Sequence, residues 1–154
     1  MKKLTIAAIF ALALTAGSAW ADNSLTAYGT YWDADNSGKG AGLRYKKAFL
    51  GFGAVDGRAG YVDFNSIETE MVPLELSINA RLPFMISPYV GVGGGYYLLD
   101  SKLGAVDNSS GYFAQLGVEA TFLWIGAMAE VRWHDLEENY FDGTSFNAGL
   151  LIKW

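Results

Sequence analysis

The sequence predicts an all-β fold, an eight-stranded antiparallel up-and-down transmembrane β-barrel, from three observations. The chain begins with an export signal, its later part consists of segments in which apolar and polar residues alternate, and it ends on an aromatic residue, Trp154. Alternation with a period of two is typical of strands, since successive side chains point to opposite faces of a sheet. No run of eighteen apolar residues follows the signal, so no transmembrane helix is predicted.

The first 21 residues are predicted to be a cleaved signal peptide. Lys2 and Lys3 form a positive region, an apolar stretch follows, and Ala19-Trp20-Ala21 fits the small-x-small pattern of a signal peptidase site. The apolar stretch is too short to span a bilayer comfortably, which favours cleavage over an uncleaved anchor. The mature chain, residues 22–154, is then long enough for one domain with a single sheet system.

Composition argues against a nucleic-acid partner and against a disulfide framework. Loss of Lys2 and Lys3 lowers the number of basic residues from 11 to 9 against 16 acidic residues, so the mature chain carries a net charge of about −7. An excess of acids disfavours nucleic acid as a partner. The chain has no cysteine, so its stability is expected to come from packing and from hydrogen bonds between strands.

The C-terminal hairpin, Ile125 to Trp154, shows the strand pattern clearly. In its first half, an uncharged face alternates with a face that carries Glu130, Arg132 and His134. Six further strands are predicted before it: Ser24–Trp32, Lys39–Lys46, approximately Leu50–Phe64, Glu70–Leu82, Pro88–Leu99 and Gly111–Phe122. The fourth of these ends at Pro83, because proline cannot supply a ladder N–H. Glycines in the third blur its pattern and leave its faces unassigned.

The connections fall into two classes, which predicts an orientation. Those near residues 47–49, 83–87 and 123–124 are tight or apolar, whereas those near 33–38, 65–69, 100–110 and 137–143 are polar and mostly longer. Outer-membrane barrels have short periplasmic turns and longer external loops, so both mature termini are predicted to be periplasmic. Aromatic belts are predicted at the two lipid interfaces: Phe49, Phe84, Phe122, Trp124 and Trp154 near the periplasm, and Tyr31, Trp32, Tyr61, Phe64, Trp133 and Tyr140 near the outside.

Together these features resemble the small outer-membrane β-barrel superfamily that includes OmpX and the membrane domain of OmpA. The resemblance covers the whole mature chain and includes Pro88-Tyr-Val-Gly-Val-Gly-Gly-Gly-Tyr96, Glu130-Val-Arg-Trp-His134 and the aromatic terminus, which is Trp where such barrels usually end in Phe. It implies a monomer in the cell outer membrane, inserted by the barrel-assembly machinery through the C-terminal strand. The implied assembly signal comprises Phe146, Leu150, Ile152 and Trp154. Because the motifs are architectural, they imply a fold and a location rather than an activity.

Two motifs that suggest ligand sites each lack an essential residue. Asp33, Asp35 and Ser37 imitate the start of a calcium loop, but Arg44 occupies the twelfth position, where a bidentate Glu is needed. Glycines 91 and 93–95 suggest a phosphate cradle, but Tyr96 stands where the dinucleotide pattern needs glycine, and no helix follows. The sequence therefore predicts no metal site and no cofactor.

A lipid A-modifying barrel enzyme that uses His134, the single histidine, is one alternative to a non-enzymatic protein. Barrel-type lipid A deacylases place a serine two residues after the catalytic histidine, and Leu136 occupies that position here. Asp135 and Ser145 are near in sequence, but alternation sends Asp135 to the face opposite His134. No catalytic residue is therefore assigned.

Eight charged residues are predicted to face the barrel lumen, in equal numbers of each sign. They are Arg44, Arg58, Arg81 and Arg132 with Asp56, Glu75, Glu119 and Glu130. Inside so narrow a barrel, such charges are expected to form a core in which each charge is paired or hydrogen-bonded. Neutralising Arg81 or Arg132 alone is then expected to leave a carboxylate unpaired. An interior filled by side chains also weakens the second alternative, a minor conduit for small solutes.

Most acidic residues fall in or beside the predicted external connections. They are Asp33, Asp35, Asp63, Glu68, Glu70, Asp100, Asp107, Asp135, Glu137, Glu138 and Asp142, accompanied among the bases by Lys39 and Lys102. Carboxylates near the anionic phosphates of lipopolysaccharide repel them unless divalent cations or a cationic partner intervene. The sequence thus predicts a non-enzymatic outer-membrane protein that contributes to membrane integrity or surface interaction, with outer-membrane lipid and lipopolysaccharide as partners. A rim that only confers solubility is the open alternative.

Overall fold

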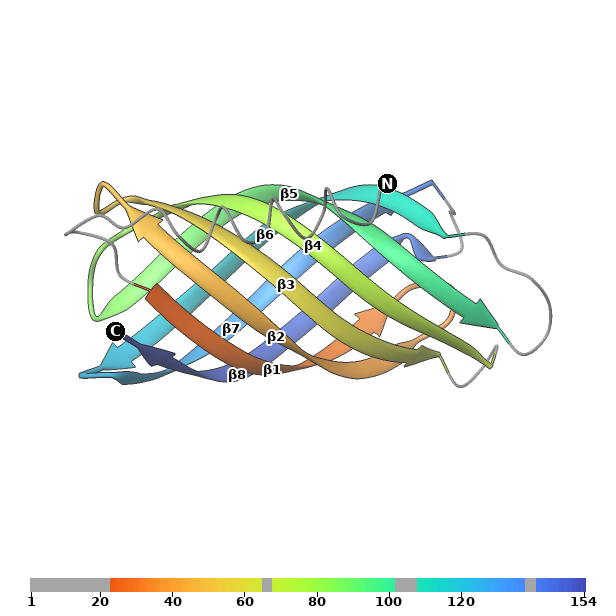
Figure 1. Cartoon of the computed structure of the whole chain (residues 1–154), viewed down its shortest axis with the longest axis horizontal. Helices are drawn as coiled ribbons and strands as arrows, with labels where there is room; N and C mark the ends of the chain where they lie inside the picture. The colour runs from red at the N-terminus through yellow and green to blue at the C-terminus, as the bar shows by residue number, and fades with distance from the viewer. Residues whose placement is uncertain (1–22, 65–67, 102–107, 138–140) are drawn as a thin grey trace, which may run out of the picture.

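The computed structural model describes residues 23–64, 68–101, 108–137 and 141–154, which form one closed antiparallel barrel. Its strands are β1 (Asn23–Asp33), β2 (Gly38–Phe49), β3 (Gly53–Phe64), β4 (Thr69–Arg81), β5 (Ile86–Ser101), β6 (Ser109–Phe122), β7 (Ile125–Leu136) and β8 (Gly143–Lys153). Each strand pairs with its neighbour in sequence, and β8 pairs with β1, so the sheet has no open edge (Figure 1). The predicted eight-stranded up-and-down barrel is confirmed.

Over much of its length, the barrel is polar inside and apolar outside. Along each strand, residues that face the lumen alternate with residues that face outward. In β4, for example, Glu75, Ser77 and Asn79 are buried, whereas Leu76 and Ile78 are 43% and 55% exposed. A barrel surrounded by lipid requires this arrangement, because its outward face must be apolar.

The two ends of the barrel differ in the length of their connections (Figure 1). Tight turns at residues 50–52, 82–85 and 123–124 lie at the end where β1 begins and β8 finishes, which we call the terminal end. The opposite end, where β1 leads to β2 and β7 leads to β8, is the long-loop end. The two predicted classes of connection therefore lie at opposite ends, although which end is external stays a prediction.

The strand boundaries differ from the predicted ones mainly at the first turn of the terminal end. β2 continues through Phe49, and the reversal occurs at Leu50 and Gly51, whose φ angles are 53° and 74°. Glycine adopts this left-handed conformation at little cost, which permits a tight turn here. The predicted signal peptide lies outside the described residues and stays a prediction. No helix within the described ranges is long and apolar enough to cross a membrane.

Pro73 interrupts the hydrogen-bond ladder between β3 and β4. The register pairs Ala59 with Leu74 and Val62 with Met71, and it skips the two residues between them on each strand. Proline has no N–H to donate, which accounts for a missing ladder bond at this position. The side chain of Pro73 is buried on the lumenal face.

An apolar cluster fills the lumen at the long-loop end. Its members are Trp32, Val62, Phe64, Met71, Tyr97, Leu99, Leu136 and Phe141, none more than 8% exposed. Trp32 Nε1 donates a hydrogen bond to the carbonyl oxygen of Phe141 at 3.1 Å. This bond fastens the residue that precedes β8 over the end of the lumen, so the cluster closes the barrel there.

The outer aromatic belt is therefore smaller than predicted. The prediction that Trp32 and Phe64 belong to it is wrong, because both lie on the lumenal face of their strands. Tyr31, Tyr61 and Trp133 do face outward at the long-loop end. Tyr140 lies outside the described residues. At the terminal end, the aromatic residues with exposed side chains include Phe52, Phe84, Phe122, Trp124 and Trp154.

We expect an arginine on the outward face to be costly at mid-height and tolerated near the rim. Leu116 lies in the middle of β6, where Leu116→Arg should destabilise the barrel by about 2–4 kcal/mol in a bilayer. Tyr112→Arg, nearer the long-loop end of the same face, should cost about 0–1 kcal/mol. Urea unfolding in phospholipid vesicles, followed by tryptophan fluorescence, measures both. Equal losses would contradict a hydrocarbon layer at mid-height.

Candidate functional site

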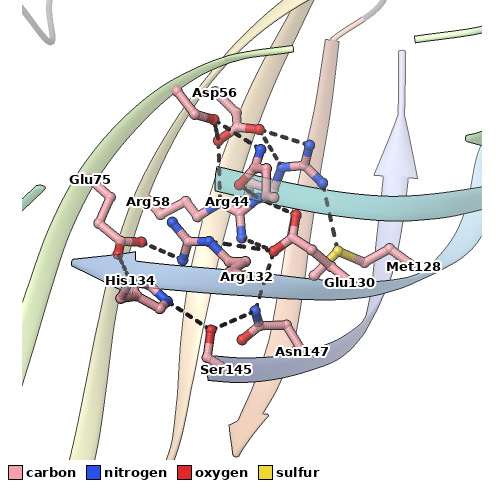
Figure 2. A network of polar contacts seen from close by, with 12 residues as sticks. Arg44, Asp56, Arg58, Glu75, Met128, Glu130, Arg132, His134, Ser145 and Asn147 are labelled. Atoms are coloured by element: carbon pink, nitrogen blue, oxygen red, sulfur yellow. Dashed lines mark hydrogen bonds and ion pairs between the residues drawn. The ribbon is translucent and has the colours of Figure 1, made fainter. Parts of the chain in front are cut away.

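A network of charged side chains fills the lumen between the apolar cluster and the terminal end (Figure 2). This lumenal network comprises Arg44, Lys46, Asp56, Arg58, Glu75, Glu119, Glu130 and Arg132, none more than 5% exposed. Its members come from β2, β3, β4, β6 and β7, so it draws on both sides of the barrel. Buried charges require partners, and the contacts of the network show how each carboxylate is satisfied.

The most complete ion pair joins opposite walls of the barrel. Arg58 on β3 donates from Nη1 and Nη2 to the two carboxylate oxygens of Glu130 on β7, at 2.6 and 2.7 Å. In a closed sheet of eight strands, β3 and β7 lie diametrically opposite. Tyr89 Oη donates to Glu130 Oε2 at 2.6 Å, and Asn147 Nδ2 donates to Oε1 at 3.2 Å. A bidentate pair with added donors is the strong form of a charged hydrogen bond.

Arg44 makes a second link across the lumen. Its Nε donates to Asp56 Oδ2 at 2.9 Å, and its Nη1 donates to Glu119 Oε1 at 2.9 Å. Glu119 also contacts Lys46 Nζ through its other oxygen. Arg44 on β2 and Glu119 on β6 again belong to opposite strands. The barrel is thus braced across its width at more than one level.

Neutral polar side chains satisfy the remaining acceptors of Asp56. Ser77 Oγ donates to Asp56 Oδ1 at 2.7 Å, and Asn79 Nδ2 donates to Oδ2 at 2.9 Å. Gln115 Nε2 in turn donates to Ser77 Oγ at 3.1 Å and to Asn79 Oδ1. Since a half-satisfied buried network destabilises a core, these contacts favour a structural role for the charges.

Arg132 and Glu75 form the pair nearest the apolar cluster. Arg132 Nη1 donates to Glu75 Oε2 at 2.6 Å, and Tyr97 Oη donates to Glu75 Oε1 at 3.0 Å. The guanidinium carbon of Arg132 lies 3.9 Å from the centre of the Phe113 ring, a cation–π contact. This pair lies where the lumenal network meets the apolar cluster.

The structure brings Ser145 to His134, a pairing that alternation along one strand could not predict. His134 Nε2 lies 2.9 Å from Ser145 Oγ, and its Nδ1 lies 3.9 Å from Glu75 Oε1. A serine, a histidine and a carboxylate in this order could in principle activate a nucleophile. Here the Tyr97 hydroxyl is closer to Nδ1, at 3.4 Å, and the Trp32 ring stacks on His134 with a centroid distance of 3.9 Å.

The predicted lumenal residues all face the lumen, but they are not equally connected. Seven of them belong to the network, whereas Arg81 makes no ion pair with any described residue. The expectation that loss of Arg81 unpairs a carboxylate is therefore wrong. Sequence reasoning also missed Lys46, which follows Arg44 by two positions and so shares its face. Strict alternation along β2 would have found it.

The lumen leaves almost no free space beside the network. The hollow bounded by Tyr28, Pro73, Glu75, Arg132 and Ser145 has a volume of about 10 Å³. A cavity needs roughly 10–15 Å³ to hold one water molecule. Side chains therefore fill this part of the lumen almost completely.

The predicted acidic loop residues lie at the long-loop end wherever the structure describes them. Asp33, Asp35, Asp100 and Glu137 are exposed, whereas Asp107 and Glu138 lie outside the described residues. Asp142 has a local role, because its Oδ1 accepts a hydrogen bond from the Leu136 backbone N–H at 2.6 Å. Within the described ranges, no three histidine, aspartate or glutamate side chains are arranged to hold a metal ion.

Three other acids form a row on the outward face. Asp63 pairs with Glu70 across β3 and β4, and Glu70 pairs with Asp100 across β4 and β5. Directly opposed residues of antiparallel strands have Cα atoms about 4.5–5.5 Å apart, so these carboxylates are close neighbours. We call Asp63, Glu70 and Asp100 the acidic row.

The residues of the implied assembly signal lie on the outward face of the last strand. Phe146, Leu150 and Ile152 are 48%, 70% and 46% exposed, and Trp154 at the chain end is 60% exposed. β8 pairs with both β7 and β1 and so closes the barrel. Their role as a signal stays a prediction.

No protein-family model and no curated protein matches the sequence. Several solved structures match the fold. The outer membrane protein OprG from Pseudomonas aeruginosa aligns with a TM-score of 0.70 and 15% identity, over 86% of this chain and 95% of OprG. Neisserial surface protein A gives 0.67 and 15%, over 90% and 99%. Ail of Yersinia pestis gives 0.52 and 15%, over 87% and 97%. The chain thus has the fold of small eight-stranded outer-membrane barrels.

We expect Arg132→Met to destabilise the barrel by about 3–5 kcal/mol, because it leaves the buried Glu75 carboxylate without its ion-pair partner. The matched control is Arg81→Met, which removes a lumenal arginine without an ion pair among the described residues and should cost less. The double variant Arg132→Met/Glu75→Gln should recover part of the loss. Urea unfolding in detergent measures the three free energies. Equal destabilisation by both arginine variants would contradict the assigned pairing.

Proposed function

We propose that this chain is a non-enzymatic outer-membrane protein that contributes to membrane integrity by presenting carboxylates to lipopolysaccharide. The acidic row is the observation that carries the proposal. Asp63, Glu70 and Asp100 lie side by side on the outward face at the long-loop end, where they meet the surrounding lipid rather than the lumen. Divalent cations shared between these carboxylates and lipopolysaccharide phosphates would join the protein to the outer leaflet.

The proposal orients the barrel with its long-loop end outside and both mature termini in the periplasm. Short periplasmic turns and longer external loops are the pattern of known outer-membrane barrels. Insertion would proceed through the barrel-assembly machinery, which would recognise the apolar outward residues of β8. The chain would act as a monomer, since the closed sheet offers no strand edge for pairing with another copy.

The filled lumen disfavours the two alternatives. A conduit requires an open path, whereas the apolar cluster and the lumenal network occupy the interior. An enzyme that uses His134 requires access to its nucleophile, but Ser145 is 1% exposed and its histidine lies beneath Trp32. A role that uses the outward face, such as the proposed contact with lipopolysaccharide, is therefore better supported than either alternative.

The charge of the rim bears on which ligands this chain can bind. Ail was solved in complex with the heparin analogue sucrose octasulfate, a polyanion. A rim rich in carboxylates repels polyanions unless cations intervene. We therefore infer that anionic ligands bind here only with a divalent cation.

We expect the variant Asp63→Asn/Glu70→Gln/Asp100→Asn to lose the magnesium dependence of lipopolysaccharide binding. Removing three carboxylates removes the groups that share the cation, so the affinity in magnesium should fall by about tenfold, whereas binding without magnesium should be weak for both proteins. Titration of the purified barrel with lipopolysaccharide, with and without magnesium, measures the effect.

The control for this experiment is Asp33→Asn/Asp35→Asn, which neutralises two exposed acids outside the row. It should retain magnesium-dependent binding. Heat-modifiable gel mobility verifies that both variants are folded. Unchanged binding by the triple variant would leave the acids as solubilising charge, and equal losses in both variants would indicate a diffuse charge effect rather than a role of the row.

We expect Ser145 to resist labelling by an alkyl fluorophosphonate, because its hydroxyl is buried in the folded barrel. The reagent should modify neither the wild-type protein nor Ser145→Ala. Intact-protein mass spectrometry after incubation in detergent measures the adduct. Labelling that disappears in Ser145→Ala would show an accessible, activated nucleophile and would overturn the non-enzymatic assignment.

A further inference from the structure

A shallow apolar groove lies on the outward face of the barrel at the terminal end, far from the acidic row. It has a volume of about 430 Å³ and is lined mainly by Phe49, Phe52, Ile78, Ala80, Val90 and Val92. The lining residues come from β2 to β5 and from the turn at residues 50–52. Neither the lumenal network nor the proposed role of the rim uses this groove.

The groove arises from small residues in one row of paired positions. Phe49 pairs with Gly53, Gly53 with Ala80, and Ala80 with Val90, so these four residues cross four adjacent strands. Adjacent strands lie about 4.8 Å apart, and the middle two positions carry no side chain larger than a methyl group. The ring of Phe49 lies over Gly53 and forms one wall, Val90 forms the other, and Ala80 forms the floor.

The neighbouring row adds an apolar wall and one cation. Lys47 pairs with Val55, Val55 with Ile78, and Ile78 with Val92, and all four side chains face outward. Lys47 also pairs with Asn23, the first residue of β1, so it lies near the terminal end of the barrel. Its side chain can therefore extend along the apolar surface while the ammonium group reaches the membrane interface.

Charge at this end is complementary to an anionic headgroup. In the terminal half of the barrel, no aspartate or glutamate side chain among the described residues lies on the outward face, and Lys47 makes no ion pair with a described residue. A lysine near a membrane surface attracts anionic lipid. The acids gather at the opposite end, so they do not compete for this ammonium group.

We propose that the groove is a binding site for one glycerophospholipid, whose phosphate contacts Lys47 and whose acyl chain runs over Ala80, Ile78 and Val92 towards the middle of the barrel. The groove supplies apolar contact on the face that meets lipid, and the lysine supplies the counter-charge at the level of the headgroup. With the proposed orientation, this lipid belongs to the periplasmic leaflet. Only that leaflet assignment rests on the proposed function, since the groove and the cation are independent of the rim.

Native mass spectrometry of the purified barrel, incubated in detergent with phosphatidylglycerol, tests the site. The wild-type protein should retain one phosphatidylglycerol. Ala80→Phe fills the floor of the groove and should lower occupancy by about tenfold. Ala127→Phe is the matched control, because Ala127 also faces outward in the terminal half but lies on β7, outside the groove. It should retain the lipid.

Native mass spectrometry also tests the contact between Lys47 and the lipid headgroup. Lys47→Gln should weaken phosphatidylglycerol retention by about fivefold, and Lys47→Arg should restore it. Lys39→Gln is the control, since Lys39 faces outward on the same strand at the other end. Equal loss in Ala80→Phe and Ala127→Phe, or unchanged retention of phosphatidylglycerol in Ala80→Phe, would overturn the proposal. The assay contains neither lipopolysaccharide nor magnesium. Its result therefore does not depend on whether the acidic row binds lipopolysaccharide.

Discussion

The closure of eight strands around a narrow lumen constrains the rest of this structure. An eight-stranded barrel has an interior that side chains just fill, so each inward residue must pack and each inward polar group must find a partner. The bidentate pair of Arg58 with Glu130 meets both demands, because it fills the width of the lumen and ties β3 to β7. Removing one partner of a buried ion pair leaves the other charge unpaired. It therefore costs more folding free energy than replacing both partners with apolar residues.

The side chains that fill the lumen change from charged to apolar along its length. Towards the terminal end it holds ion pairs, whereas at the long-loop end it holds an apolar cluster capped by Phe141. The cluster thereby separates the charges within the barrel from the long-loop end. Each carboxylate of the lumenal network has hydrogen-bond donors, and the network is buried. The large exposed side chains of the described residues lie on the outward face and at the ends of the barrel.

The sequence predicted the strands well because alternation is a local property. It placed Arg44 inward and Leu43 outward without knowledge of any neighbour, and strict use of the same rule would have added Lys46 to the lumen. Trp32 was misassigned because an aromatic residue near a strand end fits both an interface belt and a lumenal cluster. Only its position relative to the other inward residues of β1 distinguishes the two.

Partner choice inside the barrel could not be predicted, because it depends on how the closed sheet brings distant strands together. Arg58 is directly opposite Glu75 in the β3–β4 register, yet it bonds to Glu130 across the lumen. Glu75 is bonded instead by Arg132 from β7. These choices depend on strand tilt and on the reach of each side chain, neither of which is encoded in a short window of sequence. The same limit applies to Ser145 and His134.

On the outward face, residues at paired positions of adjacent strands form rows whose members lie close enough together to contact one ligand. Residues in one row come from strands that are far apart in sequence, but their Cα atoms are only about 5 Å from one neighbour to the next. Asp63, Glu70 and Asp100 concentrate negative charge in this way, and Ala80 between larger neighbours leaves a hollow in the same way. Both features need the barrel to be closed and rigid before they exist. The buried ion pairs link opposite strands across the lumen and so support the closed sheet on which these rows lie.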